Sequence, residues 1–508
     1  MNRPAATVTP PPPAVRASSV ARNSLWNFGG QVLPLTVAAV AIPILVHHLG
    51  VDRFGVLTLV WILVGYFSLF DLGIGRAVTK LLADRIALRD EHGAAELVWT
   101  ALGCMLLLGI CFGAVLFALA PRLTHWALKI PPALQEETFR CLPWLAVAVP
   151  FVTLTCGLRG MLEAQQNFAA VNALRLAFGF TSYLAPLVVL PFSRSLYPIV
   201  LALLAVRIIS CGLHFLVCRR CVTGFSVSWS WDRTALRGLL GFGSWLTVSN
   251  IIGPLMVYLD RFVIGSLVSI SAVAYYAAPF DAVTKLWLIP AALSGVLFPA
   301  FSEALAVKDH KRATSLYERS IASTFVILFP IILGIVLFAP EGLHLWLGSE
   351  FARRSALTLQ VLAIGVFTNS LANMPYTLLQ ASGRPDLTAK LHLIEVPCYV
   401  ALLYWGVRVR GIEGAALAWT VRLSAEAGVL FFLLRGALAP RLWVTMAAGT
   451  TVLLLACRVD GLLFKFVFLV IIVGLFTVVT WRWALDDLLR LRMRSWLKAV
   501  PVLRKAAA

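Results

Sequence analysis

The sequence predicts an all-α, polytopic membrane protein with about 14 transmembrane helices. Of its 508 residues, 60% are hydrophobic and only 13% are charged, whereas soluble proteins carry about a quarter charged residues. Apolar runs of about 20 residues, long enough to cross a hydrocarbon core, recur from Leu25 almost to the C-terminus. The net charge of +19 does not indicate nucleic-acid binding, because the basic residues gather in short segments between the apolar runs.

The expected elements follow one another along the chain. A Pro-rich N-tail (1–22) predicts disorder and lacks the apolar core of a signal peptide, so the first span is expected to remain. Next come an N-terminal six-helix bundle (23–220), a cytoplasmic loop (221–236), a C-terminal six-helix bundle (237–437), two extra helices (438–482) and a basic C-tail (483–508). The expected spans are centred near Pro34, Val64, Leu107, Ala148, Phe180, Ala205, Ile252, Lys285, Leu328, Gly365, Val400, Ala418, Ala448 and Val470.

The basic residues predict the orientation of the chain. Alternate connecting segments hold dense basic groups (76–89, 219–237 and 308–319), and with both tails they carry about 27 of the 43 Lys and Arg residues. By the positive-inside rule this side is cytoplasmic, which places both termini in the cytoplasm of a cell with the protein in its inner (plasma) membrane. The C-tail is expected to contact the lipid surface. The longest loop on the outer side is expected at 121–140.

Short internal matches indicate that the chain is duplicated. Three of them lie 214, 217 and 215 residues apart: Asn27–Gly30 with Gly241–Ser244, Leu162–Ala164 with Leu379–Ala381, and Arg207 with Arg422. An even number of spans in each repeat would give both repeats one orientation, related by an axis along the membrane normal. Transporters built in this way hold their site between the repeats, near the midplane.

Five basic residues fall within apolar runs: Arg175, Arg207, Arg261, Lys285 and Arg422. A cation at the bilayer centre costs about 2.5–3.5 kcal/mol on insertion scales, so such residues commonly line a cavity or a substrate pathway. The repeat makes Arg207 and Arg422 equivalent, and two facing guanidinium groups can grip a phosphate or carboxylate. The alternative for Arg422 is local neutralisation by Glu426, four residues later.

The roles of the other three cations stay open. Lys285 lies one turn after Asp281, which permits an intrahelical ion pair that is either structural or opened by a substrate or proton. Asp260 and Arg261 are adjacent, so they point to different faces, and Arg261 can snorkel to the outer interface. Arg175, about two turns into its span, can reach the cytoplasmic interface in the same way.

Intramembrane carboxylates are the candidates for ion coupling, because they commonly relay protons. The candidates are Asp71, Glu395, Asp281, Glu426 and Asp260, with helix–helix hydrogen bonding as the alternative role for Asp71 and Glu395. No metal-spaced His/Asp cluster stands in the sequence, and the one CxxC pair, Cys218–Cys221, has no second pair. The sequence therefore predicts no cofactor, no metal ligand and no catalytic residue, with H+ or Na+ as the candidate coupling ion.

Three motifs carry a resemblance to a known family. The chain resembles the Wzx-like oligosaccharide flippases of the multidrug/oligosaccharidyl-lipid/polysaccharide (MOP) exporter superfamily over about residues 22–440. The motifs are Leu49–Val56 (LGVDRFGV) followed by Phe70–Ala77 (FDLGIGRA), then Leu259–Gly265 (LDRFVIG) followed by Ala272–Tyr276 (AVAYY), and Leu378–Arg384 (LLQASGR).

The resemblance implies two six-helix bundles around a central cavity, plus two extra helices. It also implies rocking between inward-open and outward-open states, which moves an undecaprenyl-pyrophosphate-linked oligosaccharide from the cytoplasmic to the outer leaflet. The implied coupling is to a proton or sodium gradient. The partners are then the lipid-linked substrate, membrane lipids and, as candidates, a polysaccharide polymerase and a chain-length regulator, with no nucleic acid.

Other functions stay open at this point. A membrane polymerase or ligase would need a sizeable outward loop, and the expected loop at 121–140 holds only His125 and two adjacent Glu residues. A lipid II flippase is a near relative, but the segment after the first span contains only Arg53 instead of an arginine-rich loop. A drug or ion antiporter of the same fold is the remaining alternative.

Overall fold

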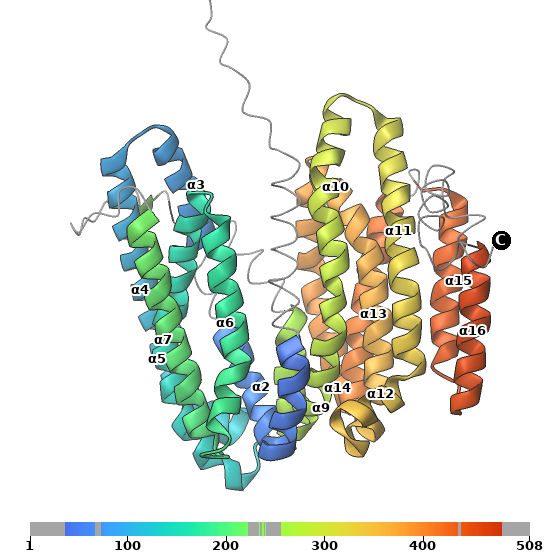
Figure 1. Cartoon of the computed structure of the whole chain (residues 1–508), viewed down its shortest axis with the longest axis horizontal. Coiled ribbons are helices and arrows are strands. Elements are labelled where there is room, and N and C mark those ends of the chain that lie inside the picture. Colours follow the sequence, from blue (N-terminus) through green and yellow to red (C-terminus); the bar gives the residue numbers. More distant parts are fainter. Residues whose placement is uncertain are drawn as a thin grey trace, which may run out of the picture.

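The computed structural model describes residues 36–66, 73–221, 256–434 and 438–479, with a few single positions between 233 and 239. Nearly all described residues are helical and none of them lies in a strand, which confirms the predicted all-α class (Figure 1). Within these ranges eight helices are long and apolar enough to cross a membrane, and three shorter apolar helices accompany them. The protein is thus a polytopic membrane protein, and the count of about 14 spans stays a prediction.

By their order in the chain we call the described helices up to Cys221 the N-half and those between 256 and 434 the C-half, and a terminal pair follows (Figure 1). The N-half contains Thr36–Leu49, α2 (Val51–Tyr66), α3 (Ile74–Ala87), α4 (Glu91–Arg122), α5 (Pro132–Ala164), α6 (Phe168–Val189) and α7 (Leu196–Cys221). The C-half contains a helix over 256–267, α9 (Ile270–Thr284), α10 (Leu288–Ala306), α11 (His310–Leu337), α12 (Ala339–Leu347), α13 (Ser349–Ala381) and α14 (Pro385–Leu433). The terminal pair is α15 (Pro440–Ala456) and α16 (Leu462–Val479). Helix α2 lies beside α9, where the two halves meet.

Three of the predicted segments fall outside these elements. The N-tail (1–22), most of the inter-bundle loop (221–236) and the C-tail (483–508) lie outside the described residues. The predicted bundle boundaries stay predictions.

The helix ends carry the repeat that the sequence indicates. Helices α5 and α13 each have 33 residues, and both their first and last residues are 217 positions apart. The turns correspond as well: Arg89 and Lys308 have positive φ angles of 56° and 57°, and the next residue caps the following helix. Asp90 accepts a hydrogen bond from Gly93 N at 2.9 Å, and Asp309 accepts one from Arg312 N at 3.0 Å.

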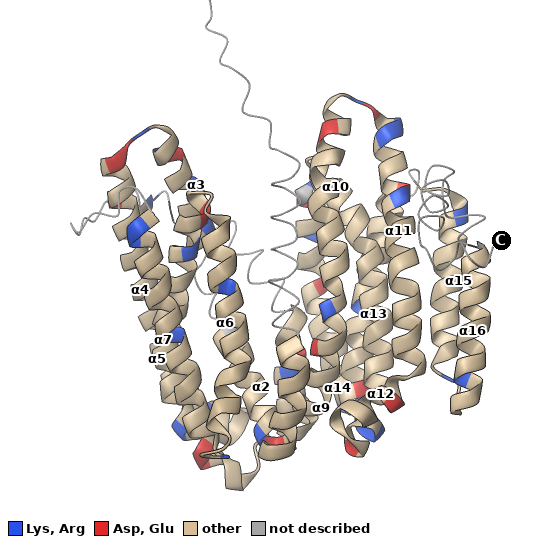
Figure 2. Ribbon diagram, viewed as in Figure 1, with Lys and Arg blue, Asp and Glu red and all other residues tan. Residues whose placement is uncertain are grey.

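The basic residues expected in loops lie largely on helices. Arg76 and Lys80 are on α3, and Arg312 and Arg319 are on α11. A 33-residue helix is about 50 Å long, which exceeds a hydrocarbon core of about 30 Å, so the long helices continue past the membrane. The α3–α4 and α10–α11 turns lie at the same end of the molecule, where charged residues gather (Figure 2).

The expected outer loop at 121–140 is also mostly helical. Helix α4 ends at Arg122, a π-helical turn follows over Leu123–Ala127, and α5 begins at Pro132. Only four residues, 128–131, lie outside helices there. An extended loop for acceptor chemistry is therefore absent from this described stretch.

Helix α14 is a hairpin of two helical arms. Gly411 has φ 58° and ψ −129°, a conformation that lies outside the helical region and that glycine adopts without steric cost. The arms then approach so closely that a Cβ on Gly414 would lie 1.9 Å from the carbonyl oxygen of Gly406. The spans predicted near Val400 and Ala418 are these two arms.

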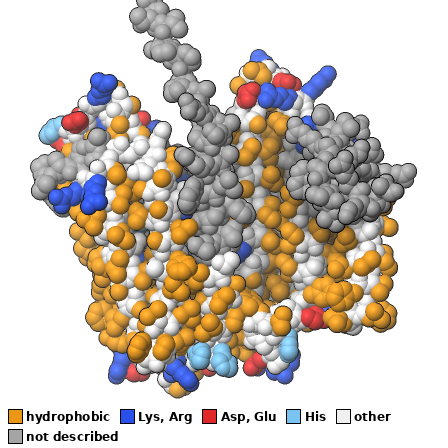
Figure 3. All heavy atoms as spheres, viewed as in Figure 1, with side chains coloured by type: hydrophobic (Ala, Val, Ile, Leu, Met, Phe, Trp, Pro, Cys, Tyr) orange, Lys and Arg blue, Asp and Glu red, His pale blue; other side chains and the backbone are white. Residues whose placement is uncertain are grey.

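The described hydrogen bonds between the N-half and C-half include a set around the start of α9. Ser271 Oγ donates to Asp52 Oδ1 at 2.5 Å, and the Lys129 backbone N–H donates to Gly265 O at 2.8 Å. At Gly55 an added Cβ would meet Ile270 O at 2.2 Å, so glycine is needed where α2 crosses α9. This end is opposite the base-rich turns, and the hydrophobic flanks of both halves lie between the two charged ends (Figure 3).

The terminal pair packs on α11 through aromatic rings. Phe476 of α16 stacks on Phe329 of α11 with ring centroids 4.9 Å apart, and it contacts Phe325 at 5.9 Å. The buried ammonium group of Lys465 at the start of α16 lies 2.7 Å from Glu341 Oε1 on α12. This ion pair satisfies a cation that would otherwise be costly to bury.

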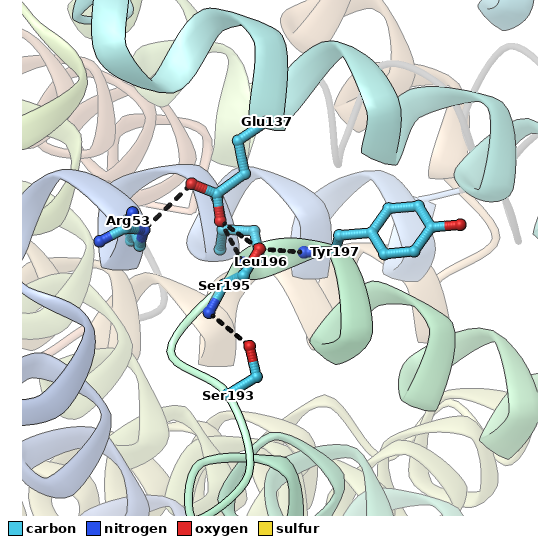
Figure 4. A network of polar contacts seen from close by, with 6 residues as sticks. All are labelled: Arg53, Glu137, Ser193, Ser195, Leu196 and Tyr197. Carbon is cyan, nitrogen blue, oxygen red and sulfur yellow. Dashed lines mark hydrogen bonds and ion pairs between the residues drawn. The ribbon is translucent and has the colours of Figure 1, made fainter.

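A polar network ties three helices of the N-half together (Figure 4). Glu137 on α5 lies 3.1 Å from Arg53 Nε on α2 and accepts a hydrogen bond of 2.7 Å from Ser195 Oγ. Its Oε1 also accepts the backbone N–H of Leu196, the first residue of α7. A carboxylate at a helix N-terminus satisfies free N–H groups and interacts favourably with the helix dipole.

We expect Glu137→Ala to lower the free energy of unfolding by about 1–3 kcal/mol, because it removes a helix cap and a partly exposed ion pair. Thermal unfolding in detergent measures the change. The matched control is Glu136→Ala, whose carboxylate pairs only with the exposed Arg140, and we expect it to cost about 0.5 kcal/mol or less. Equal losses for both variants would contradict the structural role of Glu137.

Candidate functional site

The N-half holds a cavity of about 240 Å³ with Arg207 in its wall. The cavity lies between α2, α6 and α7 and is otherwise mostly apolar or aromatic, with the hydroxyl-bearing Ser182 as a further polar residue. It is lined by Trp61, Val64, Phe178, Gly179, Ser182, Tyr183, Leu203 and Arg207.

Arg207 has no acidic partner among the described residues. Its guanidinium lies 3.8 Å from the centre of the Phe178 ring, and one of its terminal N–H groups donates to Val64 O at 3.2 Å. Its Nε is buried and makes no hydrogen bond. A buried cation without a carboxylate is electrostatically prepared to receive an anion.

The C-half holds a larger cavity of about 410 Å³, with Arg422 in its wall. Arg422 is 8% exposed, and its guanidinium lies 5.2 Å from the centre of the Tyr399 ring. The cavity has a more polar lining than the N-half cavity. It is lined by Met256, Val257, Tyr258, Trp287, Asn369, Ala372, Asn373, Tyr376, His392, Arg422, Leu423, Glu426 and Leu430.

A His–Glu–Glu cluster stands beside Arg422. One ligand atom from each of His392, Glu395 and Glu426 lies within 4.8 Å of the others. His392 Nδ1 is 3.5 Å from Glu395 Oε2, and both oxygens of the buried Glu395 lack a hydrogen-bond partner. Imidazole and carboxylate groups can hold a proton or a cation in this arrangement.

The spacing of these three residues in the sequence did not reveal the cluster, because they lie on both arms of α14. The turn at Gly411 brings Glu426 back to His392 and Glu395. His392 was absent from the predicted site residues. The available signal was its position three residues before Glu395, which places both side chains on one helix face.

The buried Arg261 forms an ion pair with the partly exposed Asp281, which corrects two expectations. Arg261 Nη2 lies 2.5 Å from Asp281 Oδ1, and Arg261 is only 2% exposed, so it does not snorkel. Asp281 therefore pairs with Arg261 and does not pair with Lys285 along its own helix. The guanidinium also lies between two rings, 5.2 Å from Tyr258 and 5.1 Å from Phe280.

Asp260 is fully buried beside this pair. It accepts a hydrogen bond of 2.5 Å from the Tyr276 hydroxyl and another from the backbone N–H of Arg261. Both partners hold its carboxylate within the protein, which suits a structural role at the start of the C-half.

Lys285 and Arg175 are not among the residues that line either cavity. Lys285 is exposed in a short 3-10 turn (Lys285–Trp287), and no ion pair between described residues includes it. Arg175 is exposed on α6. Asp71 lies outside the described residues.

Arg207 and Arg422 occupy equivalent positions on α7 and on the second arm of α14, but they line different cavities. The two cavities share no lining residue. Each half therefore has its own cavity arginine, and the binding of one phosphate or carboxylate by both arginines stays a prediction.

The comparisons with known proteins agree with this architecture. A family model of polysaccharide biosynthesis proteins matches residues 44–356. Over 415 residues the chain is 32% identical to a protein of Shigella flexneri named "Putative O-antigen transporter", which covers 82% of this chain and 97% of that protein. It is 24% identical over 181 residues to the lipopolysaccharide biosynthesis protein WzxC of Escherichia coli, covering 35% and 36% of the two chains.

Solved structures share the fold. The lipid II flippase MurJ in an inward closed conformation matches with a TM-score of 0.70 at 12% identity, over 91% of this chain and 99% of that one. An inward-facing multidrug resistance MATE family transporter of the MOP superfamily matches with a TM-score of 0.69 at 16% identity, over 81% and 97%. The fold is thus that of a multi-pass membrane protein, and the 32% identical relative is named a transporter. The chain belongs to the polysaccharide biosynthesis protein family.

We expect Asp281→Ala to lower the free energy of unfolding by about 1–3 kcal/mol, because it removes the hydrogen-bonded counter-charge of the buried Arg261 guanidinium and leaves Asp260 as its remaining acidic neighbour. Thermal unfolding in detergent tests this, with Lys285→Ala as the matched control that should change little. The double variant Arg261→Met/Asp281→Leu should recover most of the loss, since apolar groups need no counter-charge. A double variant less stable than Asp281→Ala would contradict this account.

Proposed function

We propose that the protein flips undecaprenyl-pyrophosphate-linked oligosaccharide from the cytoplasmic to the outer leaflet for polysaccharide biosynthesis. The observation that carries the proposal is Arg207, a cation without an acidic partner among the described residues, in an aromatic cavity of a polysaccharide-family transporter. Guanidinium groups match phosphate oxygens in geometry and charge, so such a cavity favours a pyrophosphate.

The proposed movement is alternating access between the two halves. The hydrogen bonds around Ser271 and Lys129 tie the halves at the end opposite the base-rich turns. If the base-rich end is cytoplasmic, as the positive-inside rule indicates, these contacts close the outer end. The higher TM-score with an inward-facing MATE transporter (0.69) than with an outward-facing one (0.56) supports an inward-directed form.

The proposed energy source is an H+ or Na+ gradient acting at His392, Glu395 and Glu426. Both oxygens of Glu395 lack hydrogen-bond partners, so a bound proton or cation would relieve an unfavourable buried charge. Because these groups adjoin Arg422 in one cavity wall, occupancy there would change the field that a substrate meets.

A small-molecule antiporter or a lipid II-type flippase is the second candidate. The carboxylates beside Arg422 would suit a cationic substrate, and this favours a small-molecule antiporter over a lipid II-type flippase. Arg207, which has no acidic partner in the part of the chain that the structure describes, opposes a cationic substrate, and this is why we place the oligosaccharide flippase first.

We expect Arg207→Ala and Arg422→Ala each to reduce surface polysaccharide at least tenfold while the protein remains in the membrane, because a charged hydrogen bond contributes about 1.5–3 kcal/mol. Quantification of polysaccharide in a strain complemented with each variant is the measurement. Arg140→Ala, on an exposed helix face, is the control. Normal polysaccharide with Arg207→Ala would reject the cavity assignment.

For coupling, flipping in proteoliposomes should accelerate when a pH or sodium gradient is imposed. Glu395→Gln and Glu426→Gln should abolish that response, because an amide cannot exchange a proton and binds cations weakly. Glu350→Gln, an exposed residue paired with Arg354, should keep the response. A wild-type protein that ignores both gradients would exclude antiport.

A further inference from the structure

The wall of the C-half cavity carries a stripe of amide and aromatic groups. Asn369, Asn373 and Tyr376 follow one face of α13 at intervals of four and three residues. Trp287 and Tyr258, from other elements of the C-half, line the same cavity. A concave site with a few polar groups set among aromatic side chains is typical of ligand recognition.

The amide groups of this stripe suit neutral hydroxyl groups. An asparagine side chain both donates and accepts hydrogen bonds, as a sugar hydroxyl does, whereas a phosphate only accepts. Asn373 is held in place, because Ser294 Oγ donates to its Oδ1 and Thr377 Oγ1 donates to the same serine at 3.0 Å. An amide fixed before binding loses little conformational freedom when it contacts a ligand.

The charges in this cavity disfavour an anion. Glu426 lines the wall one helical turn from Arg422, and Glu395 is within 4.8 Å of Glu426 between their ligand atoms. Two carboxylates stand against the Arg422 guanidinium and the His392 imidazole, so a pyrophosphate would meet no excess of positive charge here. The described wall of the N-half cavity holds Arg207 and no carboxylate, which is the opposite balance.

The repeat shows that the polar stripe belongs to the C-half alone. At the offset of 217 that relates α5 to α13, the equivalents of Asn369, Asn373 and Tyr376 are Val152, Cys156 and Arg159. At the same offset the equivalent of Glu395 is Phe178, and at the offset of 215 that relates Arg207 to Arg422 the equivalent of Glu426 is Cys211. The two cavities therefore keep the same arginine and differ in the groups around it.

We infer that the C-half cavity is a glycan subsite, in which Asn369, Asn373 and Tyr376 bind sugar hydroxyls and Trp287 packs against a sugar ring, while the N-half cavity takes the pyrophosphate. This inference rests on the proposed function and divides the substrate between the halves. The glycan then approaches the His392–Glu395–Glu426 cluster, and the charged end of the lipid approaches Arg207.

Binding measurements with two lipids test whether the two cavities take different parts of the substrate. The full chain in nanodiscs is titrated with undecaprenyl pyrophosphate, and separately with the glycan-bearing undecaprenyl pyrophosphate extracted from the strain that carries this chain. Asn369→Leu and Tyr376→Leu should weaken binding of the glycan-bearing lipid about tenfold and change binding of undecaprenyl pyrophosphate less than twofold. Arg207→Ala should weaken the binding of both lipids. Thr368→Val is the control, because the Thr368 hydroxyl is next to Asn369 but donates to Ile364 O within its own helix; it should weaken the binding of neither lipid.

Two other results would overturn the inference. Equal weakening of both lipids by Asn369→Leu and Tyr376→Leu, or no weakening of either, removes the glycan subsite while the proposed function stands. Wild-type protein that binds neither lipid rejects the proposed function, and the subsite with it.

Discussion

The cost of burying charge away from water governs the arrangement of this protein. A guanidinium or carboxylate in a low-dielectric interior needs a counter-charge, hydrogen bonds or an aromatic face. Arg261 has all three kinds of support, from Asp281, Tyr258 and Phe280. Arg207 has an aromatic ring and one carbonyl oxygen but no described carboxylate. The difference separates a cation that stabilises the fold from one that is available to a ligand.

The two halves illustrate how a duplicated helix arrangement can acquire two chemistries. Helices α5 and α13 keep the same length and equivalent ends. The cavity walls nevertheless differ: α13 and α14 line the C-half cavity with amide, aromatic and charged groups, whereas α2, α6 and α7 line the N-half cavity, mostly with apolar and aromatic groups around Arg207. An elongated amphiphilic substrate, charged at one part and neutral at another, matches such an asymmetric pair.

Sequence alone predicted much of the fold and part of the site. Hydropathy and the repeat offsets predicted an all-α membrane protein with equivalent arginines at 207 and 422, because these signals are local or periodic. The partner of Asp281 could not be predicted in this way: spacing favoured Lys285, but Arg261 on the preceding helix lies closer. The loops were predicted too long because hydropathy marks the membrane-embedded part of a helix, and helices such as α11 continue past it.

The hairpin at Gly411 has a mechanical consequence. His392 and Glu395 are on one arm of α14, and Arg422 and Glu426 are on the other, so the spacing of four ionisable groups depends on the angle between the arms. The backbones of Gly406 and Gly414 are in close contact near the turn. A change in the angle between the arms would therefore change the distances among these four groups and with them the electrostatic energy of the cluster.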